Sequence, residues 1–134
     1  MVMSGLVEVN RCVVFPWNCD QYGHMNVRWY AHHFDDAGYQ LWSIHGVSTK
    51  ELSNRKLYDV IANTSTNFVK ETRAGDVLVI NGGFTHVGTK SVHHHLIMTD
   101  ADNGEVCATQ DAVAVFFDAE KRCSTAMPDD IRER

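Results

Sequence analysis

Three side chains and one backbone amide between residues 20 and 27 have the types and the spacing for chemistry on a carbonyl group. Asp20 stands in a glycine-containing loop, His24 follows four residues later, and Asn26 precedes a segment with helical periodicity. A helix start carries free N–H donors and a partial positive charge, so it can hold a developing oxyanion. A carboxylate nearby can attack the carbonyl carbon or deprotonate a water molecule that does. The pattern therefore indicates acyl transfer or hydrolysis at Asp20 and the Val27 amide.

The same residues also have ordinary structural uses. An aspartate ahead of a helix commonly forms an Asx-turn or a cap, and a loop histidine commonly stabilises its loop. His24 could orient Asp20, contact a substrate or fix the loop, and the sequence leaves these three roles open. It also leaves open whether Asp20 acts as nucleophile or as general base.

The periodicity on either side of this loop predicts the elements that hold it. Residues 6–15 are rich in β-branched side chains, which predicts a strand. One face of this strand carries Val7, Val9, Val13 and Phe15. From Val27 onward, apolar residues recur every three or four positions over about 18 residues, which predicts an amphipathic helix. Asn26 is its expected N-cap and Gly46 its expected C-terminal stop.

Almost all of the chain after this helix is predicted to be extended. Four long strands are expected at residues 57–71, 77–86, 90–99 and 105–117. Tight turns, with Asn103–Gly104 as the strongest hairpin signal, make these strands antiparallel. The sequence therefore predicts an α+β fold, in which an antiparallel β-sheet of about five strands wraps around one long central α-helix. This arrangement is the hotdog fold. One helix cannot cover so wide a sheet, and we expect a homo-oligomer.

Composition sets broad limits on the function. The 134 residues contain no linker or repeat, so we expect a single domain over residues 1–134. A net charge of −5 argues against nucleic acid, and no apolar run is long enough to cross a membrane. No signal peptide is recognisable, so we expect a cytoplasmic protein. No metal is expected, because the four cysteines lack zinc spacing and only His93 and His95 of their run share a strand face.

The stretch from Phe15 to Tyr30 resembles the signature of the 4-hydroxybenzoyl-CoA thioesterase-like branch of the hotdog superfamily. In that signature a strand ends in an Asp-x-x-Gly-His-x-Asn loop, and the helix that follows carries a tyrosine. Residues 72–76 also fit the family pattern at a turn, so the resemblance covers nearly the whole chain. It implies an enzyme that hydrolyses a small acyl-CoA to free acid and CoA. It further implies no cofactor, and active sites between the subunits of a homodimer or homotetramer.

The resemblance also implies roles for individual residues. Asp20 matches the catalytic carboxylate, and the Val27 amide matches the oxyanion donor. Residues 58–63 of a second copy are expected to line the acyl pocket. In benzoyl-type enzymes a run of basic residues contacts the CoA phosphates, and this sequence keeps only Lys90 of that run. The predicted catalytic positions are Asp20, His24 and Val27. The predicted substrate contacts are Trp17, Tyr22, Asn26, Tyr30, Asn63 and Lys90.

A narrower resemblance concerns the acyl group. The block Pro16-Trp17-x-Cys19-Asp20, followed by residues 23–30 and Phe34-Asp35, resembles the betainyl-CoA thioesterases of bacterial carnitine breakdown. A quaternary ammonium group favours an aromatic cage, because ring faces attract cations. The aromatic residues near enough in sequence are Trp17, Tyr22, Trp29 and Trp42. Their ordinary alternative is a place in the core or in a dimer contact.

Two other functions remain open from the sequence. Hydratases and dehydratases with the hotdog fold also carry an Asp and a His in a loop, although with a longer separation than Asp20 and His24 have. A non-catalytic acyl-CoA-binding sensor would use the same pocket without turnover. The retained Asp20 argues against the sensor, since binding alone needs no carboxylate at an electron-rich thioester.

Overall fold

The computed structural model describes residues 5–134. Its elements are, in chain order, strand β1 (Val7–Val13), 3-10 helix η1 (Pro16–Asn18), helix α1 (Val27–Ile44), helix α2 (Thr49–Asn54), strands β2 (Leu57–Phe68), β3 (Val77–Val87), β4 (Ser91–Asp100), β5 (Val106–Asp118) and β6 (Cys123–Ser124), and helix α3 (Asp129–Arg132).

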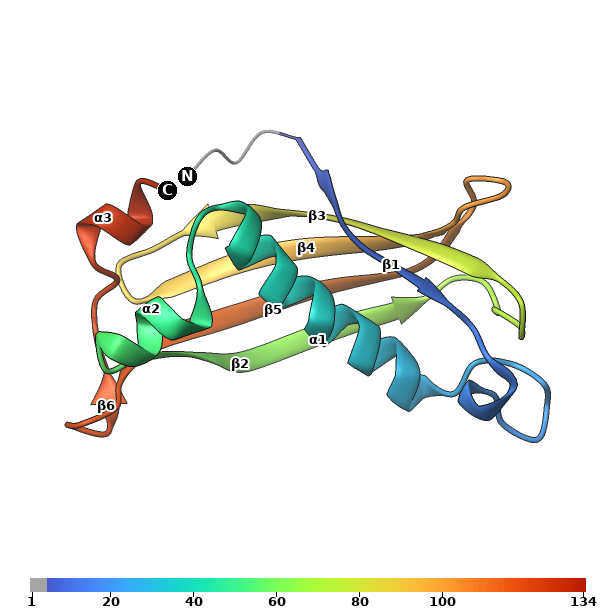
Figure 1. The fold of residues 1–134 in the computed structure, drawn as a ribbon, viewed down its shortest axis with the longest axis horizontal. Helices are drawn as coiled ribbons and strands as arrows, with labels where there is room; N and C mark the ends of the chain where they lie inside the picture. Colours follow the sequence, from blue (N-terminus) through green and yellow to red (C-terminus); the bar gives the residue numbers. More distant parts are fainter. Residues whose placement is uncertain (1–4) are drawn as a thin grey trace.

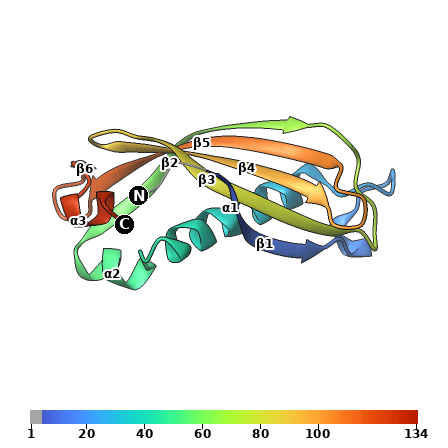
Figure 2. The same cartoon turned by 90° about the horizontal axis from the view of Figure 1, so that it is seen from above.

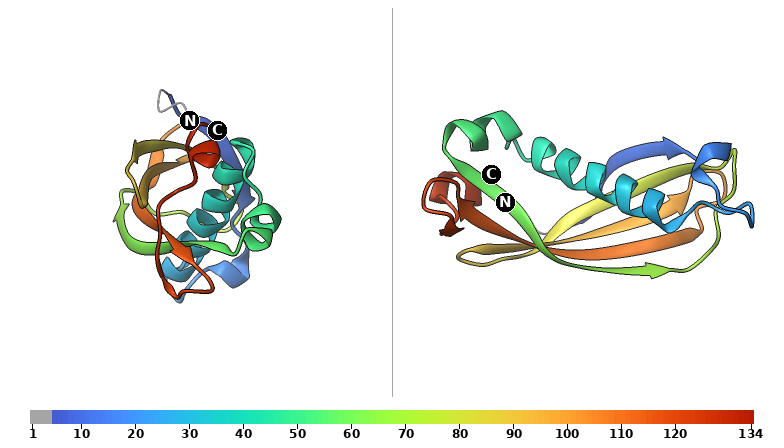
Figure 3. Two further views of the ribbon diagram at one scale, coloured as in Figure 1. Left: turned by 90° about the vertical axis from the view of Figure 1, so that its left-hand side faces the viewer. Right: turned by 90° about the horizontal axis from the view of Figure 1, so that it is seen from below.

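The strands form one curved antiparallel sheet. Their order is β1-β3-β4-β5-β2, and the short β6 pairs with β5. Helix α1 lies along the concave face of this sheet (Figures 1 and 2). Seen end-on, the sheet curls around the helix (Figure 3). The predicted hotdog arrangement is therefore confirmed, and the part of the chain that the structure describes has six strands where about five were expected.

Helix α1 has the limits that the sequence predicts. It starts at Val27 behind Asn26, whose side chain accepts a hydrogen bond from the Arg28 N–H. It ends at Ile44, and Gly46 follows with a φ of +79°, a left-handed conformation that glycine adopts without strain. The residues of α1 that are buried against the sheet are Tyr30, Phe34, Ala37, Leu41 and Trp42.

Two local predictions are wrong. In β1 only Val9 of the expected apolar face is buried, because a β-bulge between Glu8 and Asn10 shifts the register against β3. Val14, just after the strand, is buried instead. Helix α2 was not predicted, although Ser48 caps it by accepting the Glu51 N–H at 3.0 Å.

The two edges of the sheet differ. β1 has seven residues, whereas β2 has twelve and is exposed over most of its length. Exposed apolar side chains on β2 include Tyr58, Val60, Ile61 and Phe68. A long apolar edge strand is a template for pairing with another strand.

Among residues 5–134, no helix combines the length and apolar character that crossing a bilayer requires. The expectation about a signal peptide rests partly on residues 1–4, which lie outside the described residues.

Candidate active site

Residues 18–26 form a tight hairpin that carries Asp20. The Asn26 N–H donates to the Asn18 carbonyl at 2.8 Å, and the Asp20 N–H donates to the His24 carbonyl at 3.0 Å. The Gly23 N–H closes the turn on the Asp20 carbonyl at 3.0 Å. Gly23 has a φ of +79°, which favours glycine, so the Asp-x-x-Gly spacing matches the geometry of this turn.

The half-buried Asp20 carboxylate takes part in its own turn. Its Oδ1 accepts the Tyr22 N–H at 2.9 Å, so the Asx-turn that the sequence left open is present. His24 pairs with Asp20 across the hairpin, and Asn26 lies two residues after His24. Two residues of extended chain span about 7 Å. Helix α1 begins at the next residue. Asp20 and the start of α1 therefore belong to one hydrogen-bonded unit.

The N-cap of α1 uses one of the two amides at the start of the helix. Asn26 Oδ1 accepts the Arg28 N–H at 3.1 Å, so the cap uses the second amide of the helix. The Val27 N–H is at the first helical position, where the helix itself provides no acceptor, and the Val27 side chain is exposed. The predicted N-cap is confirmed. The cap does not use the Val27 N–H, which can therefore donate a hydrogen bond to a ligand.

The connection between β2 and β3 supports the hairpin. His24 Nε2 lies 3.1 Å from Glu71 Oε2, and the Met25 N–H donates to the Thr72 carbonyl at 2.8 Å. The buried Tyr30 hydroxyl lies 2.9 Å from Thr72 Oγ1. Burial raises the pKa of Tyr30, which keeps this hydroxyl protonated at neutral pH. Of the roles left open for His24, these contacts fit the fixing of the loop. Catalytic action by His24 and substrate contact by Tyr30 stay predictions.

The four aromatic residues considered for a cage do not come together. Trp17 and Tyr22 are 70% and 73% exposed at the hairpin, where the Trp17 ring stacks on Phe15 at 4.6 Å. Trp42 is 6% exposed and packs on Phe84 in the core, with ring centroids 4.8 Å apart. Trp42 therefore lies apart from Trp17 and Tyr22, because its position near the C-terminal end of α1 places it in the core. Substrate contacts by Trp17 and Tyr22 remain predictions.

Asn63 and Lys90 lie away from the hairpin within one chain. Asn63 is exposed in the middle of the edge strand β2. Lys90 lies in the turn between β3 and β4, at the far end of β3 from Arg73, whose segment pairs with the hairpin (Figure 1). The eleven residues of β3 span about 36 Å. Lys90 can therefore approach the Asp20 hairpin only from another copy of the chain, and its predicted contact with CoA stays a prediction.

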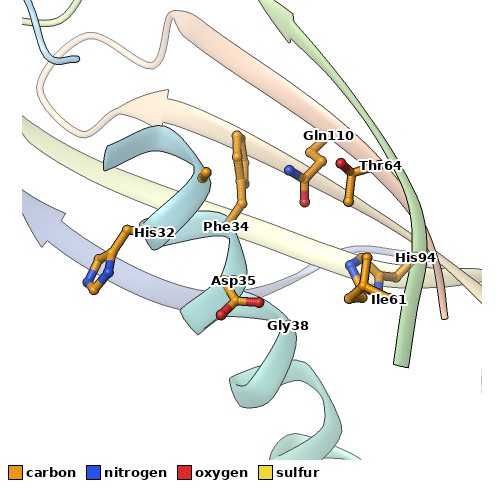
Figure 4. A pocket seen from close by; sticks show the side chains of 9 residues that line it. His32, Phe34, Asp35, Gly38, Ile61, Thr64, His94 and Gln110 are labelled. Carbon is orange, nitrogen blue, oxygen red and sulfur yellow. The ribbon is translucent and has the colours of Figure 1, made fainter. Parts of the chain in front are cut away.

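A cavity of about 400 Å³ opens between α1 and β2 (Figure 4). Its walls are partly apolar, with Phe34 and Ile61, and its polar groups come from distant parts of the chain. These groups are Asp35 on α1, Thr64 on β2, His94 on β4 and Gln110 on β5. The cavity also begins close to the start of α1, since Ala31 lies only four residues after Val27.

His94 is an unusual residue in the wall of this cavity. It is only 4% exposed, and its Nδ1 has no hydrogen-bond partner. Burial lowers its pKa to about 4, so the imidazole is neutral at physiological pH. The ring lies against Gly38 of α1, where an added Cβ would be in ordinary contact with His94 Cε1 at 3.7 Å. An unpaired buried nitrogen costs free energy, and a polar ligand in the cavity could recover it.

A second carboxylate lies beside the cavity. A narrower extension of about 50 Å³ is lined by Asp35, Trp42, Asp59 and His94 among others. Burial raises the pKa of Asp59, and the nearby Asp35 carboxylate raises it further. The space between α1 and β2 thus combines carboxylates with aromatic and aliphatic walls. Sequence reasoning missed His94 and Gln110, because no spacing in the sequence links these residues to one cavity. Asp59 belongs to residues 58–63, which were expected to line the acyl pocket of a second copy, and it lies beside the cavity of its own chain.

Comparison with known proteins agrees with this geometry. Residues 14–134 match the model of the thioesterase-like superfamily. The chain belongs to the thioesterase-like superfamily. A comparison with curated protein sequences finds no match.

Solved structures that this thioesterase-like chain resembles share its hotdog fold. A hypothetical protein from Staphylococcus aureus, solved in complex with CoA, has a TM-score of 0.89 and 22% identity, over 99% of this chain and 83% of that one. A 1,4-dihydroxy-2-naphthoyl-CoA thioesterase from Synechocystis has a TM-score of 0.84 and 15% identity, over 96% and 93%. A gentisyl-coenzyme A thioesterase has a TM-score of 0.82 and 18% identity, over 92% and 96%.

Proposed function

We propose that this thioesterase-like protein hydrolyses an acyl-CoA, with Asp20 as general base or nucleophile and the Val27 N–H as oxyanion donor. The observation that supports this most directly is the hairpin of residues 18–26. It ties a half-buried carboxylate to a helix start whose first amide the cap does not use. Such an amide is suited to the oxyanion that forms when a thioester carbonyl is attacked.

The proposed reaction breaks the bond between the carbonyl carbon and sulfur. As a general base, Asp20 takes a proton from water while the water oxygen adds to the carbonyl carbon. As a nucleophile, Asp20 forms an anhydride that water then hydrolyses. In both routes CoA leaves as the thiolate and takes up a proton, and the acyl group leaves as the free acid.

We place the acyl group in the cavity between α1 and β2. A thioester carbonyl at the Val27 amide would direct its acyl chain toward Ala31, where the cavity begins. Asp35 is eight residues beyond Val27, about 12 Å along the helix axis, and helical side chains lean back toward the N-terminus. The carboxylate at this depth favours an acyl group with a positive charge or a hydrogen-bond donor at its far end.

Betainyl-CoA is the substrate we put forward within that class. Its quaternary ammonium group carries a fixed positive charge of the kind that Asp35 attracts, although a single carbon separates that charge from the thioester carbonyl. Tyr39 and Trp42 line the same narrow extension as Asp35. Of the four aromatic residues expected in a cage, this extension contains Trp42. An ω-trimethylammonium acyl-CoA with a longer chain is the natural comparison, because it would place the charge closer to Asp35.

We also propose that a second copy completes the site. The exposed apolar edge of β2 favours pairing with β2 of another chain, which would continue the sheet and cover the open side of the cavity. Asn63 lies in this edge and would face the neighbouring site. Lys90 would reach CoA from another copy, since within one chain it lies about one full strand length from the hairpin.

One observation favours a second candidate, the non-catalytic acyl-CoA sensor. Asp20 Oδ1 already accepts a hydrogen bond within its own turn, which is the usual structural use of an aspartate at this position. The second carboxylate oxygen, however, takes no part in that bond. The Asx-turn therefore orients the group without consuming it, and we favour the hydrolase.

Release of free thiol from a panel of acyl-CoAs tests these functions. The panel contains betainyl-CoA, a longer ω-trimethylammonium acyl-CoA, a neutral aliphatic and an aromatic acyl-CoA, and an enoyl-CoA. We expect thiol release by the wild type and its loss in Asp20→Asn with binding preserved. Asp102→Asn, which removes the same charge from an exposed turn, is the matched control.

Each other result points to a different function. Binding without turnover in the wild type would establish the sensor, and hydration of the enoyl-CoA without thiol release would establish the hydratase. Much faster hydrolysis of neutral or aromatic acyl-CoAs than of both cationic ones would overturn the betainyl assignment while leaving the thioesterase intact.

A further inference from the structure

A cluster of potential metal ligands lies on α1 outside the groups used above. His32, His33 and Asp36 each offer a ligand atom, and these three atoms lie within 4.8 Å of one another. Among residues 5–134, this is the group of three potential ligands whose donor atoms lie this close to one another. Other histidine contacts, such as those between His86 and His93 and between His95 and Asp111, are pairs.

The distances in the cluster suit a transition-metal ion. His32 Nε2 and Asp36 Oδ2 are 3.4 Å apart, one turn from each other on the helix. Ligands about 2.0–2.2 Å from a tetrahedral ion are separated by about 3.4 Å, so this pair needs no rearrangement. His33 is the next residue after His32, and its ring centroid lies 5.3 Å from that of His32. A small side-chain rotation would bring it to the same ion.

The surroundings hold the imidazoles in place. The Trp29 ring packs against both, at 5.2 Å from His32 and 6.5 Å from His33 between ring centroids. His33 is half-buried, and its Nε2 has no hydrogen-bond partner. A metal ion is one partner that an imidazole nitrogen without a hydrogen bond can take.

The neighbouring thiol does not belong to the donor set. Cys12 lies half-buried on β1. Among residues 5–134, the group of ligand atoms within 4.8 Å of one another contains no cysteine sulfur. The available donors are two imidazole nitrogens and one carboxylate oxygen, a set typical of zinc and similar ions that leaves a coordination position open.

We propose that His32, His33 and Asp36 form a binding site for a divalent transition-metal ion of the zinc type on the surface of α1. None of the three ligands takes part in the bond-breaking step of the proposed hydrolysis. His32 lines the cavity between α1 and β2 in which we place the acyl group, so its variants are judged by metal affinity and not by activity (Figure 4). A bound ion with an open position there could accept a ligand atom from a second copy of the chain.

The test uses the untagged full chain and metal salts alone. Co²⁺ binding is followed by visible absorption, and Cu²⁺ binding by quenching of Trp29 fluorescence, because Trp29 packs against two of the ligands. Zn²⁺ affinity is measured by calorimetry. We expect one ion per chain. We expect His32→Ala and Asp36→Ala, both at exposed positions, to weaken binding by at least the roughly 10- to 100-fold known for loss of a metal site's supporting residue.

Two controls make the result decisive. The double variant His93→Ala/His95→Ala removes two histidines from the sheet and should bind as the wild type does. Unfolding temperatures without metal should match those of the wild type in every variant, while Zn²⁺ should raise that temperature only where the α1 ligands are intact. Equal metal affinity in wild type and His32→Ala, or a thiolate charge-transfer band with Co²⁺, would overturn the proposal.

Discussion

The hairpin before α1 and the cavity between α1 and β2 differ in how completely their polar groups are hydrogen-bonded. In the hairpin, the backbone groups of Asp20, Gly23 and Asn26 are paired at 2.8–3.0 Å, and the Asp20 side chain is held by its turn. In the cavity, His94 keeps an unpartnered nitrogen, and the edge strand β2 is exposed. The first region is complete within one chain. The second has polar groups and surface that another molecule must satisfy.

This difference suggests that the hairpin serves catalysis and that the cavity serves selection of the acyl group. Groups that would take part in the reaction gain from being fixed in advance, because their reorganisation then costs nothing during catalysis. Groups that would choose the acyl chain gain from being unsatisfied, because the right ligand recovers the free energy of the missing contacts. Changes in the hairpin should therefore affect turnover, whereas changes in the cavity should affect selectivity, stability and association.

The largest effect is expected in the hairpin. We expect Asp20→Asn to lower kcat for thiol release by about 10²- to 10⁴-fold, the range for loss of a positioned acid–base group. The asparagine side chain can still accept the Tyr22 N–H, so the turn should persist. Thiol release and the unfolding temperature would both be measured. A loss of less than tenfold would contradict a chemical role for Asp20.

The burial of neutral His94 in the cavity wall should make the free energy of unfolding depend on pH. The pKa of His94 is lowered from 6.5 to about 4, so the unfolded chain binds more protons between these values. The stability from neutral His94 is fully present above pH 6.5 and is lost as the pH falls to 4. The free energy of unfolding should decrease by about 3 kcal/mol from this group alone.

Denaturant titrations from pH 7 to pH 4 measure this effect. His94→Gln should flatten the pH dependence relative to the wild type. His93→Gln, its half-buried neighbour on the opposite face of β4, should leave it as it is. The same slope in all three proteins would show that His94 is not held neutral by burial.

A smaller effect is expected on selectivity. Asp35→Asn removes the charge but keeps the shape of the cavity wall. We expect kcat/KM for cationic acyl-CoAs to fall by about 10- to 100-fold relative to a neutral acyl-CoA, because two opposite charges about 4 Å apart attract by about 1 kcal/mol in water and about 4 kcal/mol near a protein surface. Asp102→Asn serves as the control. Equal losses for cationic and neutral substrates would remove Asp35 from acyl selection.

The smallest effect concerns the edge of the sheet. We expect Val60→Lys on β2 to weaken self-association by about tenfold, because a lysine on an edge strand opposes pairing. Val7→Lys on β1 is a matched control, since Val7 and Val60 are 46% and 44% exposed on opposite edges of the same sheet. Sedimentation velocity would measure both. Weaker association in Val7→Lys alone would place the interface on β1.

Short-range signals account for much of what could be predicted. The limits of α1 follow from apolar periodicity, the Asn26 cap and Gly46, all of which act within a few residues. Helix α2 was overlooked although its cap, from Ser48 to the Glu51 N–H, has a local signature. The pattern of His32, His33 and Asp36 is equally local, and their spacing on a predicted helix was open to recognition.

Long-range placement could not be predicted in the same way. The β-bulge near Val9 changed which side chains of β1 are buried, although their alternation in sequence looked regular. His24 meets Glu71, a residue from the connection between β2 and β3, and no spacing pairs these two. The family signature indicated that His24 matters, yet its partner depends on how the hairpin lies against the sheet.

The sequence by itself determined the order of the elements, the helix that follows the Asp20 loop and the turn chemistry of that loop. These features depend on backbone hydrogen bonds and side-chain periodicity between near neighbours. Only the tertiary structure decided that Asp35, His94 and Gln110 share one cavity, because α1, β4 and β5 meet there through packing and strand register. Contacts between distant residues depend on the whole core, so a local pattern cannot specify them.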